Sequence, residues 1–199
     1  ASIRKEYLQG GLRRCQMPDD PLVVFEEWLG EAVEARLVEP TAMVVATVSQ
    51  ECRPSTRTVL LKGLEEGRFV FFTNYESRKG QQIETNPCVS LSFLWYGLER
   101  QVHIEGRAVE LSAAESDAYF DSRPLGSRIG AVVSPQSRVI GSRTGLMREF
   151  VHMRDRYGLS HGQKQEGDQK ANNIPLADSP ASQDLRDHPA SIDISGLKR

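Results

Sequence analysis

The sequence predicts an α+β fold that is mainly β: an antiparallel sheet curled toward a barrel, with flanking helices. Five segments rich in β-branched and aromatic residues lie between residues 42 and 110. They are closely spaced, and a helical crossover fits into only one of the links, so antiparallel neighbours are expected. Amphipathic segments before and after these strands predict covering helices.

Size and charge narrow the possible classes of protein. A chain of 199 residues can form one substantial core with appendages, and its net charge of -2 argues against electrostatic binding to nucleic acid. No apolar run approaches the ~20 residues of a membrane span, and the N-terminus lacks the apolar centre of a secretory signal. Cys15, Cys52 and Cys88 show neither disulfide nor metal-ligand spacing. We therefore expect a soluble cytoplasmic protein without a metal site.

The N-terminal part predicts an arm followed by a helix. Residues 1–18 are mostly polar and indicate a mobile arm, with a disordered terminus as the alternative. The helix should be capped by Asp19 or Asp20, with Pro21 in its first turn, and should end at Pro40. Its apolar positions recur at helical spacing and include Phe25, and Trp28 is expected in the core.

The strands are predicted from short apolar runs. They are expected at residues 42–48, 57–62, 68–72, 89–94 and 99–110. The last is long and contains Gly106, which indicates a bend or a bulge.

Three helices and a tail complete the prediction. One helix starts at Ser77 and ends before Pro87; a second follows the capping box at residues 112–115 and runs to about 122. On that second helix Tyr119 and Arg123 would lie one turn apart on one face, before residues 123–127 break it. A short apolar turn at 129–133 precedes the last helix, at 143–157. Residues 158–199 contain no aromatic residue and are expected to be disordered or loosely attached.

Cations and a helix start suggest a site for phosphate. Arg57 and Lys62 bracket one strand, and Thr73 precedes the helix that begins with Arg78 and Lys79. Helix N-termini, arginine forks and lysine charges all favour phosphate oxygens, although strand-end cations are more often simply solvated. Residues 57 and 62 would point to opposite faces of a regular strand, so either a bulge intervenes or one residue acts from the strand end.

Several motifs resemble one known family. The segments RKEY from Arg4, TAMVVATV, RTVLLK, FFTNYESRKG, LERQV, YFDSRPLGSRIGA and SPQS are similar, in unbroken order over residues 3–157, to pyridoxine (pyridoxamine) 5′-phosphate oxidases. The resemblance implies the FMN-binding split barrel, a six-stranded antiparallel Greek-key barrel, and a homodimer with two FMN sites at its interface. It also implies oxidation of pyridoxine or pyridoxamine 5′-phosphate to pyridoxal 5′-phosphate, with O2 reoxidising the flavin to give H2O2.

The resemblance also implies residue roles. FMN would be held by Arg57, Thr58, Val59, Leu60, Leu61, Lys62, Phe72, Thr73, Arg78, Lys79 and Gln101. Gln136 and Ser137 would contact the second FMN, which is held mainly by the partner subunit. The vitamer phosphate would contact Lys62, Tyr119, Arg123 and Ser127, with Arg4 and Tyr7 in a lid. No side chain is an evident general base, so no catalytic residue is assigned. The implied domains are an arm at 1–18, the split barrel at 19–157 and an atypical tail at 158–199.

The tail departs from the family pattern. The family has tryptophan-bearing C-terminal segments and an Arg-Leu-His-Asp-Arg segment over the substrate, whereas this chain has only Trp28 and Trp95. Residues 185–188 (Leu-Arg-Asp-His) echo the last motif faintly. Two strands of the barrel and part of the substrate wall are therefore expected to be missing, by divergence or by a frame or splice change. Three hypotheses follow: an FMN-dependent oxidase of vitamin B6 phosphates, a non-catalytic binder of FMN or a vitamer, and another flavin reductase.

Overall fold

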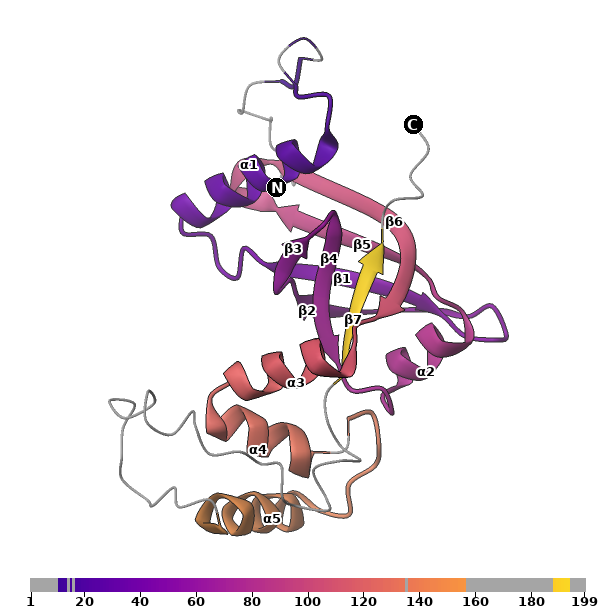
Figure 1. Ribbon diagram of the computed structural model, residues 1–199, viewed down its shortest axis with the longest axis vertical. Coiled ribbons are helices and arrows are strands. Elements are labelled where there is room, and N and C mark those ends of the chain that lie inside the picture. The colour runs from indigo at the N-terminus through magenta and orange to yellow at the C-terminus, as the bar shows by residue number, and fades with distance from the viewer. Residues whose placement is uncertain (1–10, 14, 16, 135, 157–187, 194–199) are drawn as a thin grey trace, which may run out of the picture. The chain divides into compact units, whose positions relative to one another are not determined.

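The computed structural model describes residues 11–13, 15, 17–134, 136–156 and 188–193 (Figure 1). They fall into two compact units. The first comprises the described parts of 1–71, 86–108 and 192–199, and the second those of 72–85 and 109–191. The N-terminal residues Arg4 and Tyr7 and most of the predicted tail lie outside the described residues.

The strands form one sheet. They are β1 (Ala42–Val48), β2 (Pro54–Leu60), β3 (Gly63–Glu65), β4 (Arg68–Thr73), β5 (Cys88–Trp95), β6 (Arg100–Glu110) and β7 (His188–Asp193). Their order is β2-β1-β5-β6-β7-β4-β3 (Figure 1). The pairs β1–β2, β1–β5, β3–β4 and β5–β6 are antiparallel, which confirms the predicted sheet type. In the described part of the chain the sheet has seven strands, whereas the family fold implied six. The first and last strands in the order are β2 and β3.

Strand β7 corrects one expectation about the tail. The prediction of a disordered or loosely attached segment at 158–199 falls mostly outside the described residues, but residues 188–193 form a strand between β6 and β4. A strand is held by backbone hydrogen bonds, so a segment with few apolar side chains can still occupy a sheet position. Composition alone therefore misjudged these six residues.

The core of the first unit lies between the sheet and helix α1 (Pro21–Glu34). Phe25 of α1 packs edge-on against Phe69 and Phe93, with ring centroids 4.8 and 4.9 Å apart. Met43 lies opposite Phe93 in the β1–β5 register, and both are buried. Because side chains alternate along a strand, this register places a continuous apolar face beneath α1.

Helix α1 ends earlier than predicted. Of the two predicted capping residues, Asp20 caps the helix start by accepting a hydrogen bond from the Leu22 N–H (2.9 Å). Its end is set by Arg36, which has φ 52°, rather than by Pro40. The N–H groups of Arg36 and Leu37 donate back to carbonyls of the last turn, at 2.9 and 3.1 Å. This is a Schellman motif with arginine in the left-handed position, which a search for glycine or proline does not detect.

Trp28 is half-buried rather than fully in the core. The Arg100 guanidinium lies 4.8 Å from the centroid of its ring and pairs with Glu31 of the same helix. Cation–π contacts of this kind hold a helix against a strand end.

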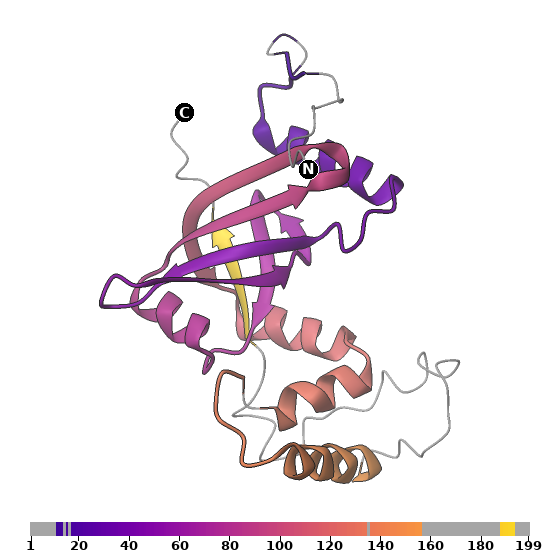
Figure 2. The same ribbon diagram turned by 180° about the vertical axis from the view of Figure 1, so that it is seen from behind.

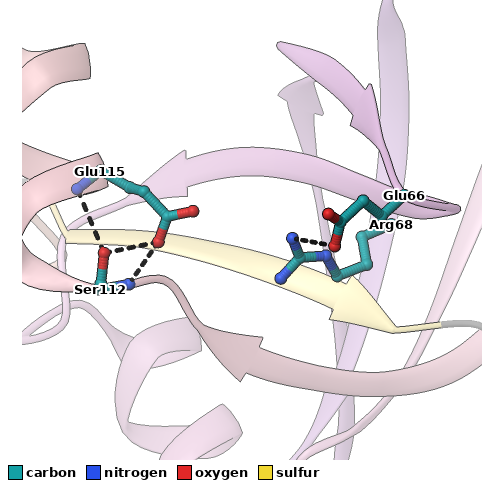
Figure 3. A network of polar contacts seen from close by, with 4 residues as sticks. All are labelled: Glu66, Arg68, Ser112 and Glu115. Atoms are coloured by element: carbon teal, nitrogen blue, oxygen red, sulfur yellow. Dashed lines mark hydrogen bonds and ion pairs between the residues drawn. The ribbon is translucent and has the colours of Figure 1, made fainter.

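Two strand predictions also change. β2 ends at Leu60, and Leu61 and Lys62 link it to β3. β6 curves along its length (Figure 2), but its register with β5 is uninterrupted from Arg100 to Arg107, so the alternative of a bulge at Gly106 is wrong. The β3–β4 turn has positive φ at Glu66 and Gly67, and Arg68 pairs with Glu66 at 3.3 Å (Figure 3).

The described residues of the second unit form four helices: α2 (Arg78–Thr85), α3 (Ala113–Ser122), α4 (Leu125–Val133) and α5 (Arg143–Arg156). α4 and α5 pack through an apolar cluster that includes Ile129, Val132 and Met153. The predicted capping box is present (Figure 3): Ser112 Oγ accepts from the Glu115 N–H at 3.3 Å, and Glu115 accepts from the Ser112 N–H at 2.9 Å.

The segment after α3 differs from the prediction. α4 begins directly after Pro124, so the helix is longer than the turn expected at 129–133. Arg123 has extended dihedrals (φ -76°, ψ 146°) and lies outside α3. Proline excludes the helical conformation from the residue before it but starts a helix readily, so the break is confined to this corner.

The described residues contain neither a candidate membrane-spanning helix nor a candidate metal-binding cluster. None of their helices combines the length and apolarity needed to cross a bilayer. No group of three or more histidine, cysteine, aspartate or glutamate side chains among them could hold a metal ion.

Candidate functional site

The predicted site residues are divided between the two units. The first unit carries residues 57–62 and Gln101, and the second carries Phe72, Thr73, Arg78, Lys79, Gln136, Ser137, Tyr119, Arg123 and Ser127. Each group is described within its own unit.

In the second unit, the loop before α2 forms a site suited to an anion. Ser77 precedes the first residue of α2, and its Oγ accepts a hydrogen bond from the Gly80 N–H at 3.2 Å. The Asn74 side chain accepts from the Glu76 N–H at 2.8 Å and shapes the loop. This is a capped helix start, where backbone N–H groups and the helix dipole favour negative charge.

Lys79 brings a buried positive charge to this loop. Its side chain is 7% exposed, and Nζ donates to Gln136 Oε1 at 2.7 Å and to Ser77 Oγ at 3.3 Å. Both of these acceptors are neutral, so a phosphate oxygen would be a stronger partner for the ammonium than either. Arg78, by contrast, is exposed at the helix start. These residues fit the phosphate of FMN.

Gly80 allows the loop to lie against the helix. A Cβ at this position would lie 2.3 Å from the Tyr75 carbonyl oxygen. The Tyr75 side chain is held by Glu110, and burial together with that carboxylate raises the pKa of its hydroxyl above the ordinary value, so it remains neutral. Glycine is required at position 80 because any side chain there would overlap the Tyr75 backbone.

The segment after α4 is anchored to the same loop. Besides the Gln136 contact, Arg138 pairs with Glu76 at 2.8 Å. Ser137 between them has φ 63°, a tight turn that presents both neighbours to the loop. The resemblance implied that Gln136 and Ser137 reach the FMN of the partner subunit; in this structure Gln136 contacts Lys79 of its own chain.

An aromatic stack joins a predicted cofactor residue to a predicted substrate residue. The rings of Phe72, at the end of β4, and Tyr119, on α3, lie 3.2 Å apart between centroids with planes 9° from parallel. The two residues are far apart in sequence, so no pattern along the chain could predict this contact. The stack holds Tyr119 beside the end of β4, the strand that leads into the candidate anion site.

The other substrate residues straddle the corner between α3 and α4. Arg123 is half-buried, and its N–H donates to the Phe120 carbonyl at 3.2 Å. Ser127 is exposed in the first turn of α4, where its N–H donates to the Pro124 carbonyl at 2.8 Å. The prediction that Tyr119 and Arg123 share one helix face is therefore wrong, because proline ends α3 before Arg123.

In the first unit, Arg57 is held on the inner side of the sheet. It pairs with Val45 in the β1–β2 register. Its Nη1 donates to Thr47 Oγ1 at 2.7 Å and its Nη2 to Ser55 Oγ at 2.8 Å. Thr47 is fully buried, and sequence reasoning missed both of these hydroxyls. The β-strand alternation placing Thr47 and Ser55 on the face of Arg57 was a signal that could have revealed them.

Lys62 acts from beyond the strand end. It is exposed, lies after the last residue of β2, and its N–H donates to the Val70 carbonyl at 2.8 Å. Of the two alternatives for residues 57 and 62, the strand-end position is therefore correct. Lys62 borders a groove of about 600 Å³ lined by Leu29 and Val33 of α1 and by Leu61 and Leu64. On β6, the exposed Gln101 side chain lies 2.9 Å from that of His103.

Comparisons with known proteins extend these observations. The family model described as pyridoxamine 5′-phosphate oxidase matches residues 29–157. A pyridoxine/pyridoxamine 5′-phosphate oxidase of Bacteroides thetaiotaomicron is 61% identical over 151 residues, which cover 76% of this chain and 71% of that protein. A protein of the same name from Bacteroides fragilis is 60% identical, and the match covers 64% of its length.

Solved structures show the same fold. PhzG from Burkholderia lata 383, in complex with tetrahydrophenazine-1-carboxylic acid, superposes with a TM-score of 0.77 at 22% identity, covering 94% of this chain and 83% of that one. A pyridoxamine 5′-phosphate oxidase-related, FMN-binding protein from Nostoc punctiforme gives a TM-score of 0.63 at 15% identity, covering 89% and 83%. The predicted split-barrel fold is thereby confirmed. The chain belongs to the pyridoxamine 5′-phosphate oxidase family.

Proposed function

We propose that this protein oxidises pyridoxine 5′-phosphate and pyridoxamine 5′-phosphate to pyridoxal 5′-phosphate, with O2 as acceptor and H2O2 as product. The two Bacteroides relatives are named as oxidases of these two phosphates, which supports the proposed substrates and the oxidation. The observation in the structure that carries the proposal is the Phe72–Tyr119 stack, which joins a cofactor residue to a residue assigned to the vitamer phosphate.

The residues have distinct proposed roles. FMN, when bound, would supply the electron sink for oxidation at C4′ of the vitamer, with O2 as the final acceptor. Lys79, Arg78 and the capped start of α2 would hold the flavin phosphate, and Arg57 would add a cation from the sheet. Tyr119, Arg123 and Ser127, with Lys62, would bind the vitamer phosphate. The protein's contribution is positioning and charge, and no general base is assigned.

Assembly and lid belong to the same proposal. We infer a homodimer with FMN at its interface and a lid carrying Arg4 and Tyr7, both implied by the resemblance. The cytoplasmic location stays a prediction from the sequence.

The test is an absorbance spectrum of the purified protein followed by a peroxide assay with each vitamer. We expect flavin absorption bands and stoichiometric formation of peroxide and pyridoxal 5′-phosphate. Protein that is fully loaded with FMN but releases no peroxide with either vitamer would contradict the proposed oxidation.

A second candidate is a homologue that binds FMN or pyridoxal 5′-phosphate without turnover. The tail after residue 157 lacks the tryptophan-bearing and Arg-Leu-His-Asp-Arg segments of the family pattern, and this departure favours the second candidate. Titration with pyridoxal 5′-phosphate that shows saturable binding, together with a blank peroxide assay, would support this candidate.

Replacing Arg123 with alanine should raise the KM for both vitamers. A hydrogen bond to a charged group contributes about 1.5–3 kcal/mol, so a rise of about 10- to 100-fold is expected, with FMN affinity unchanged. Arg148→Ala, which removes an exposed arginine from α5, is the matched control. An Arg123→Ala enzyme with the KM of the parent would refute the assignment.

Two substitutions of Tyr119 separate its hydroxyl from its ring. Tyr119→Phe keeps the stack on Phe72 and should raise the vitamer KM by about fivefold, the effect of one neutral hydrogen bond of about 1 kcal/mol. Tyr119→Leu also removes the stack and should cost about 1 kcal/mol more. Steady-state kinetics at saturating FMN measures both. Equal KM values for the two variants would show that the stacked ring contributes nothing to vitamer binding beyond the hydroxyl.

A further inference from the structure

Arg128 is a buried arginine whose hydrogen-bonding groups are only partly used. Its residue exposure is 0%, which is rare for arginine. Nη1 donates to Asp121 Oδ1 at 3.4 Å. Nε and Nη2 are buried and have no hydrogen-bond partner among the residues that the structure describes. Burying such donors is costly, so the presence of arginine at this position needs a physical reason.

Stability does not supply that reason. The Asp121 side chain is 60% exposed, and the 3.4 Å contact is long, so the pair gains little to offset the desolvated guanidinium. Leu125, Ile129 and Val132 of the same helix are buried and apolar. An apolar residue at position 128 would continue that pattern and would be at least as stable.

The position of the pair suggests what it does. Asp121 lies in the last turn of α3 and Arg128 in the first half of α4, so the pair spans the Arg123–Pro124 corner. Tyr119 comes two residues before the aspartate, and Ser127 directly precedes the arginine. The backbone hydrogen bonds described at the corner, from Arg123 to Phe120 and from Ser127 to Pro124, are local to each helix end, whereas the ion pair connects one helix to the other.

We propose that Arg128 is a positioning residue that fixes the angle between α3 and α4 and so makes Tyr119, Arg123 and Ser127 converge on one phosphate. The ligand named here, the vitamer phosphate, rests on the proposed function. Groups on α3, on α4 and at the corner between them bind one anion well only if that corner is rigid. A partly satisfied buried ion pair that favours one geometry at the expense of stability serves that purpose.

The experiment uses FMN-loaded protein and measures three quantities for each variant: the Kd for pyridoxal 5′-phosphate, the KM and kcat for both vitamers, and the Kd for FMN. For Arg128→Met and Asp121→Asn we expect a rise of about tenfold in the first Kd and in KM (about 1.4 kcal/mol), with kcat and FMN affinity within about twofold. The thermal midpoint of Arg128→Met should equal or exceed that of the parent. Arg128→Lys, which keeps the charge, should recover part of the affinity.

Each outcome is decisive. If Arg128→Met binds pyridoxal 5′-phosphate as the parent does, the inference is wrong. It is also wrong if stability, FMN affinity and product affinity all fall together, because that pattern shows a purely structural role. Should Arg128→Met not fold, Asp121→Asn, altered at an exposed side chain, gives the same test. A parent protein that binds the product but releases no peroxide would refute the proposed oxidation while leaving this inference testable by Kd. A parent that does not bind the product would overturn the inference as well.

Discussion

Gly80→Ala is expected to abolish FMN binding. The added Cβ would lie 2.3 Å from the Tyr75 carbonyl oxygen and 2.7 Å from the Tyr75 Cα. Both are backbone atoms, so relief requires the loop between Thr73 and α2 to move as a unit. That loop forms the capped helix start assigned to the flavin phosphate, and its displacement should weaken FMN by at least about 100-fold. The overpacked backbone should also cost about 3 kcal/mol of unfolding free energy.

A matched glycine gives the control. Gly30 lies within α1, and a Cβ there would meet nothing within 4 Å. Gly30→Ala should leave FMN affinity unchanged and add about 1 kcal/mol of stability, because alanine is the better helix former. Flavin fluorescence titration and chemical denaturation of both variants measure the two effects. An FMN affinity for Gly80→Ala within about threefold of the parent would show that the loop yields, and that the phosphate does not bind where we place it.

Local sequence signals predicted the elements on which this site is built. The strand at 42–48, the end of α2 before Pro87 and the capping box at Ser112 are confirmed, because each depends on residues close together in the chain. The helix start at Ser77 and Arg78 belongs to the same group. It places the anion site from residue types alone, since serine caps and helix N-termini have the same chemistry in any fold.

What the sequence could not provide are contacts between distant segments. The Phe72–Tyr119 stack and the Lys79–Gln136 hydrogen bond each join residues more than 40 positions apart, and neither has a periodic signal. The corner at Arg123 was misjudged for a local reason: helical spacing was extended across a residue that precedes proline. Strand β7 was missed because backbone pairing needs little from side-chain composition.

Lys79→Met is expected to weaken FMN by about 100-fold, which corresponds to about 2.7 kcal/mol, the size of a buried charge-assisted hydrogen bond. Methionine matches the length of lysine and leaves Gln136 and Ser77 in place, so the change is mainly one of charge. Because a buried ammonium is costly to desolvate, the thermal midpoint of the flavin-free variant should not fall. Titration of flavin fluorescence quenching at fixed ionic strength measures the affinity.

Riboflavin, which lacks the phosphate, separates a phosphate contact from general damage. The parent protein should prefer FMN to riboflavin strongly, and Lys79→Met should lose most of that preference by binding FMN more weakly while riboflavin affinity stays the same. Arg148→Met removes one positive charge from an exposed position on α5 and should alter neither affinity. If Lys79→Met weakened both flavins equally, the ammonium would be supporting the loop rather than binding phosphate.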